Sequence, residues 1–375
     1  MGIENGYSGT GAKLIILAGA GSSHDIGYPT LENVLKVAMI GDDGVDYIIR
    51  QTRVELEEET KDSAVFEALI VKLKDYERIA FALRKDHVLL ETYKPVQSMR
   101  DISIEQQFSR ALAKCYGILA KSYGPQVIDR NKKAFTSLSV MFDRIAKQNQ
   151  NVLDVYTTNY DCSFQVLASN FDHLSFYSHI NNEDGRFRDN WYKSRKDLDD
   201  AALSKIYVHR LHGCIAWFNQ PDRDGGPSFS YEKHGAGGSD ELSISAEELH
   251  NMCIKLIAAQ LLGTNRVFAS AFDEFNEHLR TVNTLLIWGY SFRDLEVTRQ
   301  INQALLARAD NPFKIYYVDP FLSEYKVVDN IRRTLRNAPI QISPAFRPQK
   351  IDWVPEDGRE ALTDQIVKIT EEAYS

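Results

Sequence analysis

Four short polar clusters each follow an apolar run in this chain, and their residue types suit the binding of a phosphate-bearing ligand and chemistry beside it. The clusters are Gly19–Ser23, Thr157–Asp161, His212–Gly213 and Gly289–Phe292. The glycines of the first cluster would let a phosphate approach backbone N–H groups at a helix N-terminus, where the helix dipole favours anions. The amide, carboxylate and imidazole groups of the others could orient a substrate and move protons.

The first cluster joins the apolar run Leu14–Leu17 to a helical pattern with apolar residues every three to four positions from Leu31 onward. A strand, a glycine turn and a helix form the arrangement that exposes amides to a pyrophosphate. The next glycine, Gly27, stands six residues after Gly21, so the spacing differs from the G-x-G-x-x-G of dehydrogenases. A strand-to-helix turn also needs glycine for purely structural reasons, and Ser22 could equally be only a helix N-cap.

Bulk composition narrows the class of protein. The chain has 375 residues, of which 43% are hydrophobic and 26% charged, as in soluble globular proteins. Its net charge of −8 argues against a basic nucleic-acid surface, although a local patch stays open. No apolar stretch approaches the ~20 residues of a membrane span, and the N-terminal MGIENGYSG lacks the apolar core of a signal peptide. We therefore expect a cytoplasmic protein that does not bind membranes.

The cysteines argue against a metal site. Cys115, Cys162, Cys214 and Cys253 are widely scattered and form no C-x-x-C pair. This spacing excludes a zinc ribbon built from cysteine pairs, so we expect no zinc. In an intracellular protein such cysteines are most often small buried hydrophobes, and we predict that role for all four.

The elements between the clusters predict an α/β domain. Short runs rich in β-branched and aromatic residues indicate buried parallel strands, and helical patterns separate many of them. Alternating strands and helices favour a Rossmann-like, doubly wound and mostly parallel sheet, whose ligands bind at the carboxyl ends of the strands. The four polar clusters fall at such ends. The predicted strands are Leu14–Leu17, Val152–Tyr156, Ile206–Leu211, Arg266–Ala269, Thr284–Trp288, Lys314–Val318 and Ile340–Ile342.

Between residues 44 and 150 the strand signals stop and helix-face spacings replace them. Apolar residues three and four apart predict helices over residues 66–83, 104–119 and 135–145. We therefore predict a Rossmann-like domain of residues 1–43 and 151–375 with an inserted helical module of residues 44–150. Because the module has no polar cluster at a strand end, we expect it to serve self-association or gating.

The ordered set of clusters resembles the sirtuin superfamily. The family's phosphate loop, G-A-G-x-S followed by three residues and G-x-P, fits Gly19–Pro29 throughout. Its T-x-N-x-D appears as Thr157–Asp161, its histidine–glycine pair as His212–Gly213 and its late G-x-S as Gly289–Ser291. The matches run in family order from residue 13 to about 320, so the resemblance covers most of the chain.

Two departures separate the chain from the protein deacylases of this superfamily. The deacylases carry D-F-R after the proline, where this chain has Thr30–Glu32. They also carry a zinc module of two cysteine pairs after the histidine, where this chain has only Cys214 and Cys253. The pattern is more similar to the zinc-less, sirtuin-like NAD hydrolases of bacterial antiphage defence, which often contain G-Y-S-x-x-D; Gly289–Asp294 fits that form.

The resemblance implies a role for each site residue. Asn159 and His212 would be catalytic: Asn159 would orient water or ribose, and His212 would hydrogen-bond the nicotinamide ribose and could act as general base. Asn159 could instead merely cap a turn. Asp161 would hold the nicotinamide carboxamide, and Asp319 the hydroxyls of the adenosine ribose. The other residues implied to bind NAD are Gly19, Ala20, Gly21, Ser22, Ser23, Pro29, Thr158, Gly289, Ser291 and Phe292.

By this resemblance the chain is expected to be an NAD glycohydrolase that releases ADP-ribose and nicotinamide, with NAD as its substrate. One alternative is a sensor subunit that binds NAD or ADP-ribose and signals to a partner. A second is a nuclease subunit, although we find no carboxylate–lysine metal motif for one; peptide deacylation ranks last. The family also implies a homo-oligomer and a separately encoded HerA-type ATPase or other defence partner.

Overall fold

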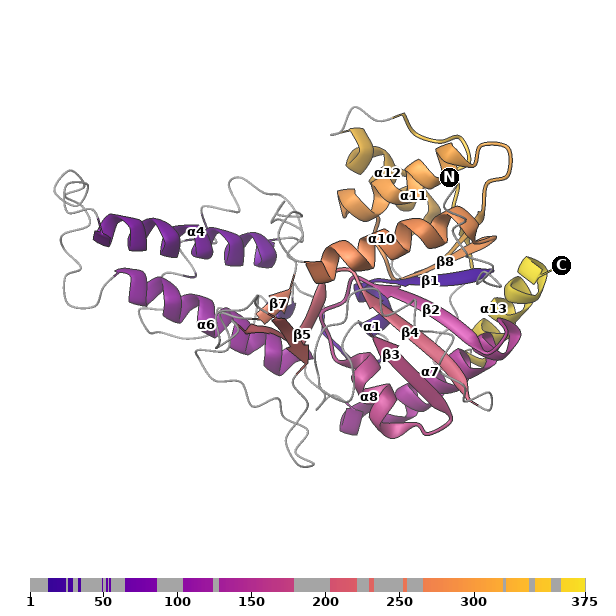
Figure 1. Cartoon of the computed structure of the whole chain (residues 1–375), viewed down its shortest axis with the longest axis horizontal. Helices are drawn as coiled ribbons and strands as arrows, with labels where there is room; N and C mark the ends of the chain where they lie inside the picture. The colour runs from indigo at the N-terminus through magenta and orange to yellow at the C-terminus, as the bar shows by residue number, and fades with distance from the viewer. Residues whose placement is uncertain are drawn as a thin grey trace, which may run out of the picture.

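A seven-stranded sheet forms the centre of the protein (Figure 1). The computed structural model describes residues 13–24, 26–29, 33–34, 49, 52, 54, 65–85, 104–123, 128–178, 203–220, 229–232, 252–254, 266–319, 322–336, 341–351 and 359–374. Neighbouring strands pair in parallel in the order β10-β9-β8-β1-β2-β4-β3, which extends to both sides of β1. The predicted Rossmann-like, doubly wound α/β fold is therefore confirmed. The strands are β1 (Leu14–Ala18), β2 (Val152–Thr157), β3 (Leu174–Ser178), β4 (Ser204–Arg210), β8 (Thr284–Trp288), β9 (Lys314–Val318) and β10 (Gln349–Lys350).

Helices cover both faces of the sheet, which explains why the central strands are apolar along their length. In β1, Leu14 and Ile16 belong to the core on one face, whereas Ile15 and Leu17 belong to the core on the other. The first face is covered by α7 (Ile128–Gln148), α8 (Ser163–Asn170) and α13 (Arg359–Tyr374) (Figure 1). The second face is covered by α10 (Arg266–Thr281), α11 (Leu295–Ala307) and α12 (Glu324–Arg336).

Two strand predictions are wrong. The run Arg266–Ala269 is the first turn of α10, because the buried residues Phe268, Phe272 and Phe275 recur at helix spacing and not in alternation. Of the predicted strand over residues 340–342, residues 341 and 342 are described and form no strand; β10 takes the edge position instead. Strand β3, at the opposite edge, was not predicted, because its mostly half-buried residues lack a continuous apolar run.

All three helices predicted between residues 44 and 150 are present. α4 (Val65–Lys85) and α6 (Ile104–Tyr123) pack on each other and project away from the sheet, whereas α7 lies on the sheet against β2, β4 and α13 (Figure 1). The division of the chain at residues 43 and 150 stays a prediction. The helical pattern from Leu31 onward lies outside the described residues apart from residues 33–34, which are helical. Among the helices described, none is both long and apolar enough to cross a membrane.

A small antiparallel sheet follows the histidine–glycine pair and was not predicted. It has the order β6-β5-β7, with β5 (Gly213–Gln220) in the centre between β6 (Phe229–Glu232) and β7 (Met252–Ile254). β5 begins at Gly213, three residues after β4 ends, and Gly213 has a φ of +79°. This conformation is easy for glycine and lets the chain turn sharply between the two sheets. His212 is thereby held at the junction of the two sheets.

A buried network of polar side chains connects α10 to strands β2 and β4. The His209 imidazole lies between two carboxylates: Nε2 is 2.8 Å from Asp154 Oδ1, and Nδ1 is 2.7 Å from Glu274 Oε2. The His209 ring stacks on Tyr156 with centroids 4.3 Å apart, and Tyr156 Oη lies 2.7 Å from His278 Nδ1. Since both ring nitrogens face carboxylate acceptors, the geometry favours a doubly protonated, positively charged His209.

We expect the stability of the protein to fall as the pH rises through the titration of His209. Burial alone would lower the pKa of His209, but the charge of Glu274 and the hydrogen bonds with Asp154 and Glu274 outweigh burial and raise it. In the unfolded chain the pKa of histidine is about 6.5. The stabilisation is therefore complete below that pH and is lost as the pH rises through the higher, folded pKa.

Urea unfolding across a series of pH values above 6 tests this prediction. The wild type should lose stability with rising pH, and His209→Gln should flatten that dependence. His173→Gln, at an exposed histidine, is the matched control and should keep the wild-type profile. An unaltered slope in His209→Gln would show that His209 titrates alike in the folded and unfolded chains.

Candidate active site

The four predicted clusters meet at the carboxyl ends of adjacent strands. Strands β8, β1, β2 and β4 are neighbours in the sheet. Backbone hydrogen bonds tie the segments that leave them: Gly19 N–H donates to Trp288 O at 2.8 Å, Thr158 N–H to Ala18 O at 3.0 Å, and Leu211 N–H to Thr157 O at 2.9 Å. The structure therefore brings the clusters into one site, as expected from the sheet topology.

The glycines of the first and fourth clusters allow two backbones to cross. A Cβ on Gly19 would lie 2.6 Å from Gly289 O, and one on Gly21 would lie 2.8 Å from Gly289 Cα. Gly289 itself has a φ of +61°, and a Cβ there would lie 2.1 Å from Ser22 N. Close contact between these two loops, called the glycine crossing below, is therefore a sufficient physical reason for glycine at all three positions.

Three amides of the predicted phosphate loop already have acceptors in the protein. Gly19 N–H donates to Trp288 O, Gly21 N–H to Gly289 O at 2.9 Å, and Ser22 N–H to Gly19 O at 2.9 Å. A pyrophosphate at this position would have to use other donors, such as the start of α1 (Ala20–His24), where Ala20 is exposed. Binding of phosphate by this loop stays a prediction.

Asn159 lies against the phosphate loop. Its Nδ2, with two hydrogens to donate, lies within hydrogen-bond distance of three acceptors: Gly19 O at 2.9 Å and the hydroxyl oxygens of Ser22 at 3.2 Å and Ser23 at 2.6 Å. The side chain is buried, and its Oδ1 has no hydrogen-bond partner among the described residues. Because an unpaired buried acceptor is costly, Oδ1 is well suited to accept a proton donor of a ligand.

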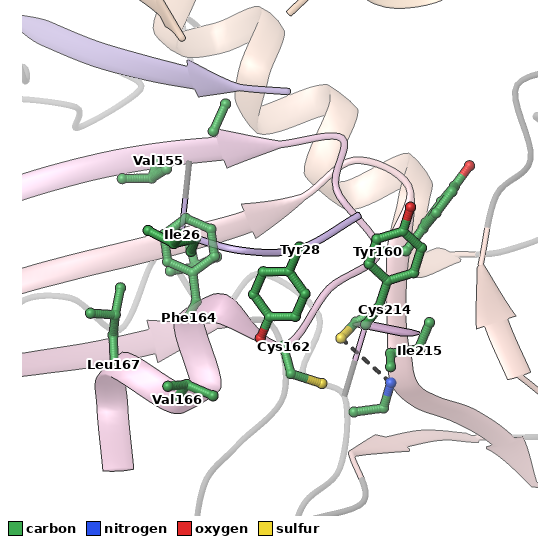
Figure 2. Close-up of a cluster of buried hydrophobic side chains, with 14 of the residues drawn as sticks. Ile26, Tyr28, Val155, Tyr160, Cys162, Phe164, Val166, Leu167, Cys214 and Ile215 are labelled. Carbon is green, nitrogen blue, oxygen red and sulfur yellow. Dashed lines mark hydrogen bonds between the residues drawn. The ribbon is translucent and has the colours of Figure 1, made fainter. Parts of the chain in front are cut away.

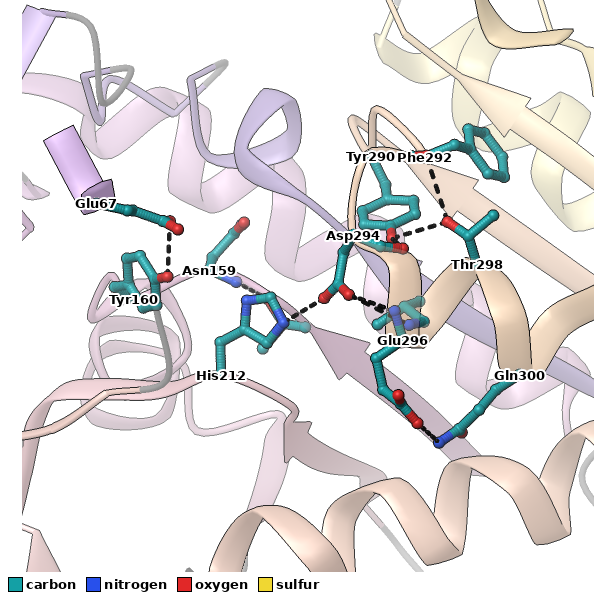
Figure 3. Close-up of polar contacts among 12 residues, drawn as sticks. Glu67, Asn159, Tyr160, His212, Tyr290, Phe292, Asp294, Glu296, Thr298 and Gln300 are labelled. Atoms are coloured by element: carbon teal, nitrogen blue, oxygen red, sulfur yellow. Dashed lines mark hydrogen bonds and ion pairs between the residues drawn. The ribbon is translucent and has the colours of Figure 1, made fainter. Parts of the chain in front are cut away.

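Among the described residues, one of the two ring nitrogens of His212 has a hydrogen-bond partner. Its Nε2 lies 2.6 Å from Asp294 Oδ2, and its ring centroid lies 6.2 Å from that of Tyr160 (Figure 3). The side chain is 1% exposed, and within the part of the chain that the structure describes Nδ1 has no hydrogen-bond partner. Asn159 and His212 therefore each present one unsatisfied buried atom, at the ends of β2 and β4.

Asp161 stabilises the loop that carries Asn159, and so does Arg210, which was not predicted to belong to the site. Asp161 Oδ1 accepts the Ser163 N–H at 2.9 Å at the start of α8. The Arg210 guanidinium is buried, and its Nη1 donates to Asn159 O at 3.3 Å and to Asp161 O at 3.0 Å. The sequence did contain a signal for this role of Arg210, because an arginine is unusual inside a predicted buried strand and this one lies two residues before His212. Binding of a carboxamide by Asp161 stays a prediction.

Two buried thiols, those of Cys162 and Cys214, lie next to the same loop (Figure 2). Cys115, Cys162 and Cys214 are buried thiols outside any disulfide, as predicted, whereas the side chain of Cys253 lies outside the described residues. A hydrogen bond with Cys214, together with burial, raises the pKa of the Cys162 thiol. A thiol with a raised pKa is a poor nucleophile, which agrees with the place of Cys162 in the hydrophobic core.

The remaining residues that were predicted to bind NAD differ in their surroundings. Asp319 is buried near the glycine crossing: its Oδ1 accepts the Leu322 N–H at 2.9 Å, and its Oδ2 would lie 3.4 Å from a Cβ on Gly21. Ser291 is half-buried and follows Gly289 by two residues in the chain. Its carbonyl oxygen accepts a hydrogen bond from Asn330 Nδ2 at 2.8 Å. By contrast, the Phe292 ring is fully buried against Phe346, and Pro29 is half-buried. For Phe292 the structure shows a core role.

Among the described residues, no group of three or more His, Cys, Asp or Glu side chains is placed to hold a metal ion.

Comparison with known proteins places this site in a family. A family model for a SIR2-like domain matches residues 154–342, half of the chain, and no curated protein matches. A crystal structure of a Sir2 homologue–NAD complex is 13% identical, with a TM-score of 0.42 over 98% of this chain and 92% of the other. A mutant Sir2 homologue in complex with ADP-ribose is 13% identical, with a TM-score of 0.39 over 97% and 94%. The family match shows that the chain belongs to the SIR2-like domain family, within the sirtuin-like superfamily.

Proposed function

We propose that the protein hydrolyses the nicotinamide–ribose bond of NAD to give ADP-ribose and nicotinamide. The observation that carries this proposal is the pair of buried side-chain atoms, Asn159 Oδ1 and His212 Nδ1, that have no hydrogen-bond partner in the described part of the chain. They lie at the carboxyl ends of the adjacent strands β2 and β4, and Asn159 also contacts the Gly19–Ser23 loop. Membership of the SIR2-like family supports NAD as the ligand.

Two acceptors suit this reaction. The bond breaks through an oxocarbenium-like transition state, and nicotinamide leaves as a neutral molecule, so the leaving group needs no acid. A water molecule must instead be placed and must lose a proton. Asn159 Oδ1 would accept a hydrogen bond from the water or a ribose hydroxyl, and His212 Nδ1 would accept the proton.

Incubation of the purified protein with NAD, with products separated by chromatography, tests the proposal. We expect ADP-ribose and nicotinamide in equal amounts without any added peptide. A deacylase would instead consume NAD only when an acylated peptide is supplied. NAD that binds in calorimetry but stays intact, at any protein concentration, would contradict the proposal and favour a sensor.

The sensor is the second candidate because hydrogen bonds link the loop that carries Asn159 to the projecting helices; one of them joins Cys162 N–H to Tyr123 O, at the end of α6, at 2.9 Å. Tyr160, next to Asn159, donates to Glu67 Oε1 of α4 at 2.8 Å, and Glu67 is buried (Figure 3). Burial and the Glu67 charge raise the pKa of Tyr160, so the phenol keeps its proton and remains a donor. A ligand that moves the Asn159 loop would therefore act directly on α4.

We also propose that the protein acts in the cytoplasm as a homo-oligomer in antiphage defence, with α4 and α6 for self-association or gating. NAD depletion is toxic, so activity must be restrained until infection, by assembly or by a partner such as a HerA-type ATPase. Projection of these two helices from the sheet, with contact to Tyr160, supports such a role.

Charge reversal on the exposed faces of these helices tests the role. Asp75→Lys on α4 and Arg110→Glu on α6 change exposed residues away from the site. We expect them to alter the molar mass measured by light scattering or the basal NAD turnover. Wild-type values for both variants in both measurements would show that the faces serve neither association nor restraint.

A further inference from the structure

The two carboxylate oxygens of Asp294 make contacts with different parts of the protein. It is the N-cap of α11, where Oδ1 accepts the backbone N–H of Glu296 at 2.8 Å and of Val297 at 3.4 Å. Its other oxygen, Oδ2, lies 2.6 Å from His212 Nε2, which is 82 residues away in the chain. A helix cap needs only the first oxygen. The second contact is therefore not explained by the helix.

The contact determines which nitrogen of His212 carries the proton. An ionised carboxylate can only accept hydrogen bonds, so Nε2 must be the donor. In a neutral imidazole the other nitrogen, Nδ1, then has a free lone pair. Nδ1 is the atom that is buried and, among the described residues, without a partner. The two observations agree on one tautomer.

We propose that Asp294 is the positioning residue that holds His212 in its Nε2–H tautomer, so that Nδ1 is the atom that takes the proton from the attacking water. This inference rests on the proposed NAD hydrolysis and assigns the atom that performs it. As the bond between the water oxygen and C1′ of the ribose forms, the C1′–N bond to nicotinamide breaks and its electron pair leaves with the neutral nicotinamide. The O–H bond of the water breaks in the same step, and its proton moves to Nδ1. The resulting imidazolium lies 2.6 Å from the Asp294 carboxylate, which stabilises the charge.

The surroundings of Asp294 keep the carboxylate in this position. Tyr290 Oη donates to the Asp294 carbonyl at 3.3 Å and lies 3.4 Å from Thr298 Oγ1. Burial and the charge of Asp294 raise the pKa of Tyr290, so the phenol remains protonated. Rotation of the carboxylate away from His212 would also break the cap on α11. The segment Gly289–Asp294 therefore joins the glycine crossing at one end to His212 at the other.

Asp294→Asn separates positioning from capping. Asparagine caps a helix about as well as aspartate, and its Oδ1 can still accept the Glu296 and Val297 amides. Its Nδ2, however, donates to His212 Nε2 and so drives the His212 proton to Nδ1. We expect a folded protein that binds NAD with wild-type affinity and turns it over about 10²–10⁴-fold more slowly. A residue that only caps α11 would leave turnover intact.

Glu296→Gln is the matched control. It removes the same charge two residues further along the same helical turn, where Glu296 pairs with Arg299 at 2.8 Å, and it leaves the bond between Asp294 and His212 in place. We expect wild-type turnover in this variant. A loss as large as that in Asp294→Asn would overturn the proposal, because the charge of the helix terminus and not the tautomer would then be responsible.

Nitrogen NMR of protein labelled with ¹⁵N-histidine reads the tautomer without any NAD. The His212 signals are assigned by their absence in His212→Gln. We expect the proton on Nε2 in the wild type and in Glu296→Gln, and on Nδ1 in Asp294→Asn. If the tautomer switches as expected but the wild type leaves NAD intact, the proposed hydrolysis fails and the assignment of Asp294 as the residue that sets the tautomer stands. A wild-type proton on Nδ1, or the same tautomer in Asp294→Asn, overturns the inference.

Discussion

Replacing either Asn159 or His212 by alanine should lower NAD turnover by about 10²–10⁴-fold and leave the protein folded. Each substitution removes one of the two buried atoms that have no hydrogen-bond partner among the described residues, and these atoms follow the adjacent strands β2 and β4. Without Asn159 Oδ1 the water or ribose loses its orientation, and without His212 Nδ1 the water has no base. The measurement is the initial rate of nicotinamide release at saturating NAD.

A second His212 variant separates the base from the hydrogen bond to Asp294. The Nε2 of glutamine can still donate to Asp294, but glutamine offers no acceptor at the position of Nδ1, so His212→Gln should be as inactive as His212→Ala. Asn170→Ala and His173→Ala, which change the same residue types at exposed positions, are the matched controls and should keep wild-type rates. Near-full activity in Asn159→Ala or His212→Gln would show that the assigned roles are wrong.

Replacing Gly289 by alanine should destabilise the protein by about 2–5 kcal/mol, the sum of a left-handed conformation for alanine and overpacking. The φ of Gly289 is +61°, and the added Cβ would lie 2.1 Å from Ser22 N and 2.4 Å from the Gly21 carbonyl carbon. These neighbours are backbone atoms, so they cannot move aside as the end of a flexible side chain would. The strain therefore spreads into the loop that contacts Asn159.

Urea unfolding gives the size of this effect, with Gly117→Ala as the matched control. Gly117 lies within α6, and a Cβ there would meet nothing within 4 Å. The same chemical change should therefore stabilise α6 by about 0.5–1 kcal/mol, because alanine has the higher helix propensity. If Gly289→Ala is as stable as the wild type, the two loops do not need their close approach, and phosphate binding becomes the better reason for the glycines.

The central part of the fold could be predicted because its signals are local. Strands buried on both faces must be apolar along their whole length, as Leu14–Ala18 and Thr284–Trp288 are. The spacing of apolar residues three and four apart predicted α4, α6 and α7 equally well. The prediction failed at Arg266–Ala269, where four residues are too few to distinguish a strand from the first turn of a helix. It also missed β3 and the sheet around β5, whose pairing depends on distant partners.

The sequence by itself determined the central strands of the sheet, the order of the polar clusters and the edge at which they meet, because parallel strands place all their carboxyl ends together. Only the tertiary structure decided how the clusters engage each other. The Asp294 carboxylate reaches His212 across 82 residues, the Arg210 guanidinium turns back to the Asn159 loop, and Gly289 crosses Gly21. Such contacts carry no periodic signature, since they depend on how two separate segments leave neighbouring strands. For the same reason, only the packed structure could show which atoms of Asn159 and His212 keep no partner among the described residues.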